Sequence, residues 1–144
     1  MNLGNFLSAR GDVQGAEHAY REALAINPGW IPAIVNLVDL YRQSGRDAEG
    51  ESLLRDALGR YPAGASLQHS LGLLLVRQKK LSDALPFLRK ATELAPDNSR
   101  FVYVYAVALH SVGKNKDALN FVVRGLKTAP FDADLLELRN ELSR

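Results

Sequence analysis

The sequence of 144 residues contains no cysteine, and this absence removes several classes of chemistry. Without thiols there is no disulfide, no thiolate metal site and no cysteine nucleophile. A strong excess of one charge is also lacking, because 18 basic residues stand against 16 acidic ones and the net charge is only +2. A chain so close to balance carries no electrostatic footprint for nucleic acid or for a membrane surface. We therefore expect no nucleic-acid partner.

Long apolar stretches are missing as well. The longest uninterrupted apolar run extends only from Phe101 to Leu109, far short of the roughly 20 residues that a membrane-spanning helix needs. The N-terminus shows no basic segment followed by an apolar one, so no signal peptide is visible. We expect a chain without a membrane span.

Catalytic motifs cannot be found either. The three histidines, His18, His69 and His110, are dispersed, and no two of them are paired at helical spacing. The sequence has no phosphate-binding loop and no GxSxG motif. We therefore predict that the chain is not an enzyme, and we expect no catalytic residue, no metal site and no cofactor.

What the sequence does contain is a repeat. Proline recurs every 34 residues, at Pro28, Pro62, Pro96 and Pro130. Small residues recur in phase with the prolines, in columns that hold Gly4, Val38, Gly72 and Ala106, then Ala16, Gly50, Ala84 and Ala118, and then Ala23, Ala57, Ala91 and Gly125. Small side chains are expected where two helices cross closely, because a bulky side chain there would cost about 1–3 kcal/mol.

Each 34-residue unit contains two amphipathic segments separated by a turn. A glycine suited to a left-handed conformation marks three of the four turns, at Gly11, Gly45 and Gly113. The third turn has Lys79 instead, and Asp47 and Ser82 are predicted to cap second helices. The stretch Phe101 to Leu109 has the composition of a buried strand. Its place in the repeat nevertheless predicts the first helix of the fourth unit.

A 34-residue helix–turn–helix unit with these columns resembles the tetratricopeptide repeat (TPR). The resemblance is strongest at "NLGN", from Asn2, and in the segment from Ala16 to Leu24. It implies an all-α fold, a right-handed α-solenoid of four antiparallel helix–turn–helix repeats plus a C-terminal helix. The segment "YVYAVALHSVGK" is similar to repeats of larger bacterial proteins, which indicates a bacterial-type TPR domain. The compartment stays open between the cytoplasm and, for a longer secreted parent chain, the periplasm.

The predicted organisation is a single TPR domain over residues 1–144. Its parts are an N-terminally truncated repeat at 1–30, repeats at 31–64, 65–98 and 99–132, and a C-terminal capping or partial-repeat helix at 133–144. Repeat stacks need polar caps at their ends. The truncated first helix therefore indicates either a fragment of a longer protein or self-association at that end.

The resemblance also implies that first helices line a concave groove. The residues expected to face it are Asn2, Asn5, Asn36, Asp39, Arg42, His69, Leu73, Val76, Arg77, Tyr103, Val107 and His110. One end is polar and the other apolar and aromatic. Asn2 and Asn36 stand one repeat apart, where related proteins grip a peptide backbone with amides. The alternative is that these amides only bind water or cap a local carbonyl.

The predicted function is a non-catalytic protein–protein interaction module that binds a peptide or a partner segment in this groove. The alternative is an assembly element that forms a homodimer through its ends or its apolar groove patch. Some co-chaperone members of the family bind a C-terminal carboxylate of a chaperone through asparagines and basic side chains, and we do not expect this activity here. The positions that would supply the basic side chains hold Met1, Ser66 and Ser70. Without them, a buried carboxylate would lack charge-assisted hydrogen bonds.

Overall fold

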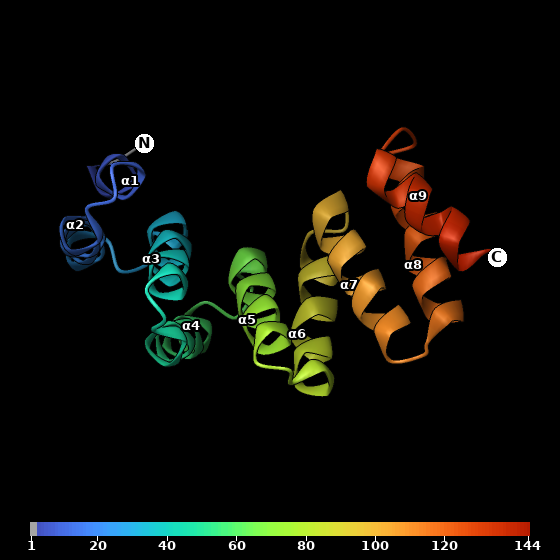
Figure 1. The fold of residues 1–144 in the computed structure, drawn as a ribbon, viewed down its shortest axis with the longest axis horizontal. Coiled ribbons are helices and arrows are strands. Elements are labelled where there is room, and N and C mark those ends of the chain that lie inside the picture. Colours follow the sequence, from blue (N-terminus) through green and yellow to red (C-terminus); the bar gives the residue numbers. More distant parts are fainter. Residues whose placement is uncertain (1–2) are drawn as a thin grey trace. The chain divides into compact units, whose positions relative to one another are not determined.

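The computed structural model describes residues 3–144, which form α-helices joined by short turns, with no β-strand among them (Figure 1). The helices are α1 (Leu3–Ala9), α2 (Val13–Ile26), α3 (Ile31–Gln43), α4 (Asp47–Arg60), α5 (Ala65–Arg77), α6 (Leu81–Leu94), α7 (Ser99–Ser111), α8 (Asn115–Thr128) and α9 (Ala133–Leu142). The predicted all-α fold is confirmed. None of these helices combines the length and the apolar character that crossing a membrane requires.

The chain divides into two compact units, residues 1–70 and residues 71–144, with the division inside α5. In unit 1, α1 packs on α2, α2 on α3, and α3 on α4. In unit 2, α6 packs on α7, and α7 packs on both α8 and α9. Each unit therefore buries its apolar side chains between helices that follow one another in sequence, and in unit 2 also between α7 and α9.

Small residues lie at two close helix crossings, as the columns predict. A Cβ atom added to Gly4 in α1 would lie 2.5 Å from Cε1 of Tyr20 in α2. A Cβ atom added to Gly72 in α5 would lie 2.5 Å from Cδ2 of Leu88 in α6. Both distances are shorter than van der Waals contact, so the absence of a side chain is what lets these helices approach.

The turn glycines adopt the predicted left-handed backbone. Their φ angles are +81° at Gly11, +71° at Gly45 and +82° at Gly113. Lys79, which replaces glycine in the third turn, has φ +60° and is the one non-glycine residue with positive φ in the described chain. A side chain in this conformation costs on the order of 1 kcal/mol.

The predicted helix caps are wrong. Helix α4 begins at Asp47 itself, and α6 begins at Leu81, one residue before Ser82. The residues before these helices, Arg46 and Lys80, form no side-chain cap. Side-chain caps occur instead at Asp12, Asn98 and Asp132, which accept hydrogen bonds of 2.9, 3.1 and 3.0 Å from the backbone N–H three residues on. Helices α4 and α6 therefore begin one and two residues earlier than the predicted caps imply.

The stretch from Phe101 to Leu109 is helical, as its place in the repeat predicts. Its buried residues form one broad face of α7, and they are Phe101, Val102, Tyr105, Ala106, Ala108 and Leu109. The Tyr105 ring meets the Phe121 ring of α8 edge to face, with centroids 4.8 Å apart and an interplanar angle of 80°. Helix α7 is apolar because α6, α8 and α9 all pack on it.

Candidate functional site

The predicted groove residues fall in both units. Unit 1 contains Asn5, Asn36, Asp39, Arg42 and His69, and unit 2 contains Leu73, Val76, Arg77, Tyr103, Val107 and His110. Asn2 lies outside the described residues. The polar end of the predicted groove thus belongs to unit 1, and the apolar end belongs to unit 2.

In unit 1, two predicted groove residues gather around one phenol. The Tyr20 hydroxyl donates a hydrogen bond to the side-chain oxygen of Asn5. Burial raises the pKa of Tyr20, and the nearby negative charge of Asp39 raises this pKa further. The Asn5 amide oxygen is thus engaged by its own repeat, whereas the exposed Asp39 remains accessible to a partner.

The other predicted residues of unit 1 differ in accessibility. Asn36 is half-buried on α3, and its side chain makes no hydrogen bond with another residue in the 3–144 range that the structure describes. Arg42 lies exposed in the last turn of the same helix. His69 is only 8% exposed, so it presents little surface to any ligand.

Unit 2 contains an open apolar pocket of about 440 Å³. It is lined by Leu73 and Val76 of α5, Lys79 in the turn that follows, Leu81 of α6, and Tyr103, Val104, Val107, Ala108 and Ser111 of α7. Tyr103 and Leu73 are half-buried, and Val76 is exposed. The first helices of two successive helix pairs therefore share one apolar surface that the other helices of unit 2 leave open.

The pocket brings together some of the predicted residues and leaves others out. Leu73, Val76, Tyr103 and Val107 line it, as the apolar end of the predicted groove requires. His110 does not. Its Nδ1 atom lies 2.5 Å from the side-chain oxygen of Asn115, and the residue is exposed. Arg77 is exposed in the last turn of α5, also outside the lining.

Sequence reasoning missed Lys79 and Leu81 as pocket residues. Lys79 belongs to the turn and Leu81 to the second helix, whereas the family resemblance places the groove residues on first helices only. A signal was nevertheless present, because Lys79 interrupts the column of turn glycines. A residue kept in a strained conformation is a reason to look for a role there.

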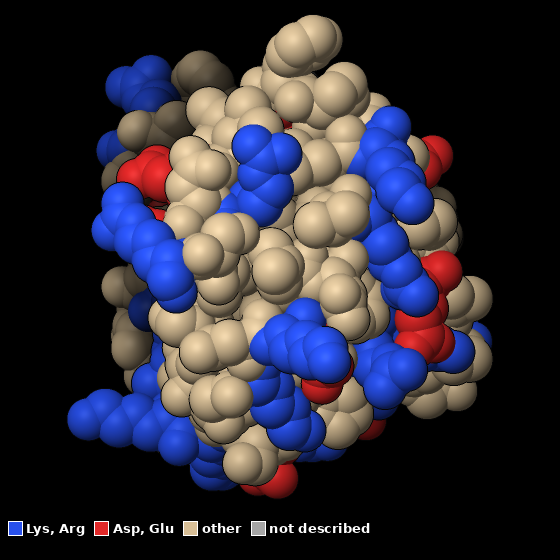
Figure 2. All heavy atoms as spheres, turned by 90° about the vertical axis from the view of Figure 1, so that its right-hand side faces the viewer, with Lys and Arg blue, Asp and Glu red and all other residues tan. Residues whose placement is uncertain are grey.

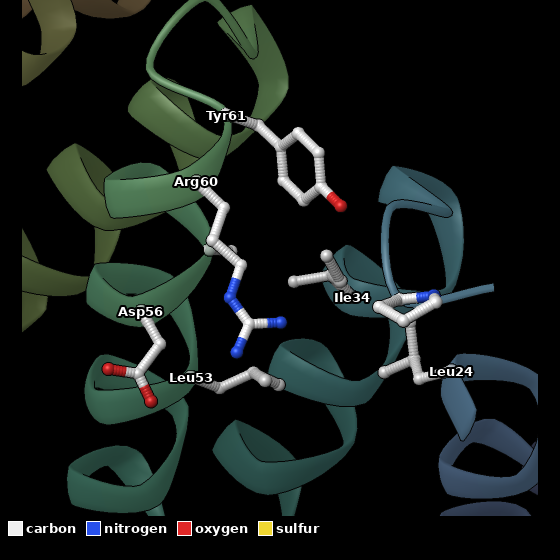
Figure 3. Close-up of a pocket in the computed structure, with 8 residues that line it drawn as sticks. Leu24, Ile34, Leu53, Asp56, Arg60 and Tyr61 are labelled. Carbon is white, nitrogen blue, oxygen red and sulfur yellow. The ribbon is translucent and has the colours of Figure 1, made fainter.

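A second pocket, of about 320 Å³, lies in unit 1 between α2, α3 and α4. Figure 3 shows Arg60 and Tyr61 extending toward Ile34. A smaller pocket of about 140 Å³ occupies the repeat-equivalent place in unit 2, with Phe121 where unit 1 has Leu53. Their recurrence with the repeat indicates crevices that result from helix stacking.

Charge is divided unequally between the units. Residues 1–70 hold 6 basic and 8 acidic side chains, and residues 71–144 hold 12 basic and 8 acidic ones, including every lysine of the chain. Figure 2 shows the face on the α8 and α9 side, where Lys and Arg side chains stand around an uncharged area. Among residues 3–144, no group of three His, Asp or Glu side chains is arranged to hold a metal ion.

Comparison with known proteins identifies the family to which the chain belongs. A profile described as "Tetratricopeptide repeat" matches residues 7–72 and 75–142, which is nearly the whole chain. The chain therefore belongs to the tetratricopeptide repeat family, whose fold is a protein–protein interaction module and whose members are typically non-catalytic scaffolds.

The chain is similar to two bacterial proteins over part of their length. The chain is 33% identical to Bacteriophage adsorption protein A of Escherichia coli (strain K12), over 51% of its own length and 9% of that protein. It is also 33% identical to Uncharacterized protein y4yS of Sinorhizobium fredii (strain NBRC 101917 / NGR234), over 63% of its own length and 50% of the relative. The chain thus spans half or less of these relatives.

A similar solved structure is that of YrrB, described as a TPR protein with an unusual peptide-binding site. The similarity covers 96% of this chain and 72% of YrrB, with a TM-score of 0.71 and 23% sequence identity. At this identity the similarity shows that the two proteins share a fold.

Proposed function

Because the chain is a TPR protein, we propose that it acts as a non-catalytic interaction module that binds a peptide or a partner segment on the α5–α7 surface of unit 2. The observation that carries this proposal is the open apolar pocket lined by Leu73, Tyr103 and Val107. Its volume of about 440 Å³ falls within the range of ligand pockets, about 300–1,000 Å³. The peptide-binding site described for YrrB, which shares this fold, is consistent with the proposal.

The physical case rests on apolar surface. Covering apolar surface stabilises a complex by about 25 cal/mol per Å², although part of this gain is spent on ordering the partner. Tyr103 is the aromatic residue of the pocket, and tyrosines dominate many binding interfaces because they supply a large contact area with few rotatable bonds. We therefore assign the largest share of binding energy to Tyr103.

Asn36 is the residue of unit 1 that we propose to contact a partner's backbone. Its amide offers both a donor and an acceptor, and within residues 3–144 neither group is engaged. Asn5, in contrast, already accepts a hydrogen bond from Tyr20. The groove role predicted for Asn2 concerns a residue outside the described chain and remains a prediction.

A peptide-display selection on the purified chain tests the proposal. The variants Tyr103→Ala and Asn36→Ala report on the two surfaces, and Asn120→Ala, an exposed residue of α8, is the matched control. We expect an enriched sequence motif whose binding weakens strongly in Tyr103→Ala and is retained in Asn120→Ala. If no peptide is enriched on a folded protein, or if enriched peptides bind Tyr103→Ala equally well, the proposal is wrong.

A second candidate function, self-assembly, is favoured by the exposed apolar residues of α1. Leu3 is 62% exposed and Phe6 is 49% exposed, and the Arg10 guanidinium lies 5.5 Å from the Phe6 ring centroid. Apolar side chains left open in this way favour association between copies. Light scattering over a dilution series checks this. A dimer that Phe6→Ser converts to a monomer would support assembly, and a monomer at all concentrations would exclude it.

A further inference from the structure

We propose that the α5–α7 pocket selects partner segments in which an apolar side chain is accompanied by an acidic residue, with Lys79 as the residue that reads the acidic charge. This inference rests on the proposed function and names the chemistry of its ligand. Three observations carry it: the position of Lys79 in the pocket, its unusual backbone, and the charge of the surrounding unit.

The position of Lys79 comes first. It lines the pocket together with eight uncharged residues, so it is the one charged side chain among the described lining residues. Lys79 forms no ion pair with a carboxylate in the described part of the chain. Lysine packs its aliphatic stem along apolar surface and keeps its ammonium group in water, at the edge of that surface. A carboxylate bound beside an apolar side chain therefore meets a cation that has no competing partner.

The backbone of Lys79 is the second observation. The other three turns of this type have glycine in the left-handed conformation, and only this turn has a residue with a side chain, at φ +60°. Two backbone hydrogen bonds fix the turn, from the Lys79 N–H to Val76 at 3.0 Å and from the Lys80 N–H to Leu75 at 2.9 Å. The turn thus fixes the position of the Lys79 Cα atom. The backbone of Lys79 has a conformation that glycine would adopt without strain. Residues with strained backbone cluster at functional sites, which makes Lys79 a candidate for a role in this pocket.

The charge of unit 2 is the third observation. It holds 12 basic against 8 acidic side chains, although the whole chain is near balance. The α5–α6 turn and the α7–α8 turn lie at the same end of this unit, and they contribute Lys79, Lys80 and Lys114 (Figure 1). The acidic residues that follow these turns, Asp83 and Asp117, lie in the first turns of α6 and α8, where a helix N-terminus stabilises negative charge. An acidic segment is the complementary ligand, and its carboxylate is that of an Asp or Glu side chain.

Charge reversal tests the inference. A random-peptide library is selected in parallel on the wild-type chain, on Lys79→Glu and on Lys90→Glu, an exposed lysine of α6 outside the pocket. The Lys90→Glu control changes the net charge of unit 2 by the same amount. We expect wild type and Lys90→Glu to enrich apolar sequences with a neighbouring Asp or Glu, and Lys79→Glu to enrich Lys or Arg at that place. A synthetic peptide of the wild-type consensus should bind Lys79→Glu about tenfold more weakly than it binds wild type. This difference in affinity should shrink at high salt.

Lys79→Gly separates recognition from folding. Glycine relieves the strain, so this variant should unfold at higher denaturant concentration than wild type and yet bind the consensus peptide more weakly. A purely structural lysine would leave the affinity unchanged. The consensus peptide is made with a free and with an amidated C-terminus, and binding that requires the free terminus would contradict a side-chain carboxylate.

The outcomes distinguish the two proposals. Peptides that depend on Tyr103 but carry no acidic preference, or that bind Lys79→Glu as well as wild type, overturn the role of Lys79 and leave the proposed function standing. A selection that enriches nothing on any of the folded proteins overturns both.

Discussion

Arg46 donates two hydrogen bonds to the carboxylate of Glu17, from Nη1 to Oε1 at 2.5 Å and from Nη2 to Oε2 at 3.2 Å. The same guanidinium lies 4.5 Å from the centroid of the Tyr41 ring, and the Tyr41 hydroxyl donates to Glu17 at 3.3 Å. Arg46 also bonds Glu49 in the first turn of α4. One network therefore ties α2, α3 and the start of α4 together within unit 1.

Glu17→Gln should lower the free energy of unfolding by about 1 kcal/mol, because the pair with Arg46 is bidentate but only partly shielded from water. The side chains of Glu17 and Arg46 are 19% and 34% exposed, which limits the gain from their attraction. Urea denaturation at neutral pH measures the change. Glu22→Gln, on an exposed residue of the same helix, is the control and should have a smaller effect.

The pH dependence of stability should show the same network. The hydrogen bond from Arg46 holds the pKa of Glu17 at about 2, below its ordinary value of 4.5, although burial opposes this shift. Because the pKa is lower in the folded state, the stabilisation is complete above about pH 4.5 and is lost as the pH falls toward about 2. Urea midpoints at pH 7 and pH 3 measure this loss. Wild type should lose more stability between these values than Glu17→Gln does, and equal losses would contradict the assignment.

Gly72→Ala should destabilise unit 2 by about 1–3 kcal/mol, because the new methyl group would overpack the crossing of α5 and α6. Its Cβ would lie 2.5 Å from Leu88 Cδ2 and 3.3 Å from the Leu88 backbone nitrogen. Gly59→Ala is the matched control. Apart from the local backbone of α4, no atom of the described chain lies within 4 Å of a Cβ at Gly59, so alanine there should stabilise by up to about 1 kcal/mol through helix propensity. Thermal denaturation of both variants checks the opposite signs.

Lys79→Gly should raise the free energy of unfolding by about 1 kcal/mol, because glycine adopts positive φ without a steric penalty. Lys80, the next residue, has φ −106° and requires no such freedom. Lys80→Gly should therefore not stabilise the protein, and the two variants form a matched pair for chemical denaturation. A gain of equal size in both would show that strain at Lys79 is not the cause.

Asn98→Ala should destabilise α7 by about 1 kcal/mol, because Asn98 caps this helix. Its side-chain oxygen accepts a 3.1 Å hydrogen bond from the Phe101 backbone N–H. Asn98→Asp preserves an acceptor and should retain stability. Hydrogen exchange of the Phe101 amide measures the local effect, and unchanged protection in Asn98→Ala would contradict it.

Several features of the fold could be predicted from the sequence because they depend on local geometry. Turn glycines at Gly11, Gly45 and Gly113 indicate left-handed backbone, and small residues such as Gly72 indicate close crossings, since each residue type suits few environments. The caps predicted at Asp47 and Ser82 are wrong because helix starts depend on where the turn places the first hydrogen bonds, which composition does not reveal.

The candidate site was predictable only in part. The repeat register identifies Leu73, Tyr103 and Val107 as candidate groove residues, and they line one pocket. It does not reveal that Lys79 joins them, because a turn residue reaches the pocket only through the packing of α5 against its neighbours. Nor does it reveal that Tyr20 engages Asn5, because the two meet only when α1 folds back on α2.

The sequence alone determined the helical repeat and its phase, because a period of 34 residues in proline, glycine and apolar side chains is typical of a helix–turn–helix unit. Only the tertiary structure decided which side chains remain open. Burial depends on which helices pack together, and it leaves His69 covered while the α5–α7 pocket stays accessible with a single lysine among its lining residues. Accessibility is a property of packed neighbours, and residues distant in sequence supply those neighbours.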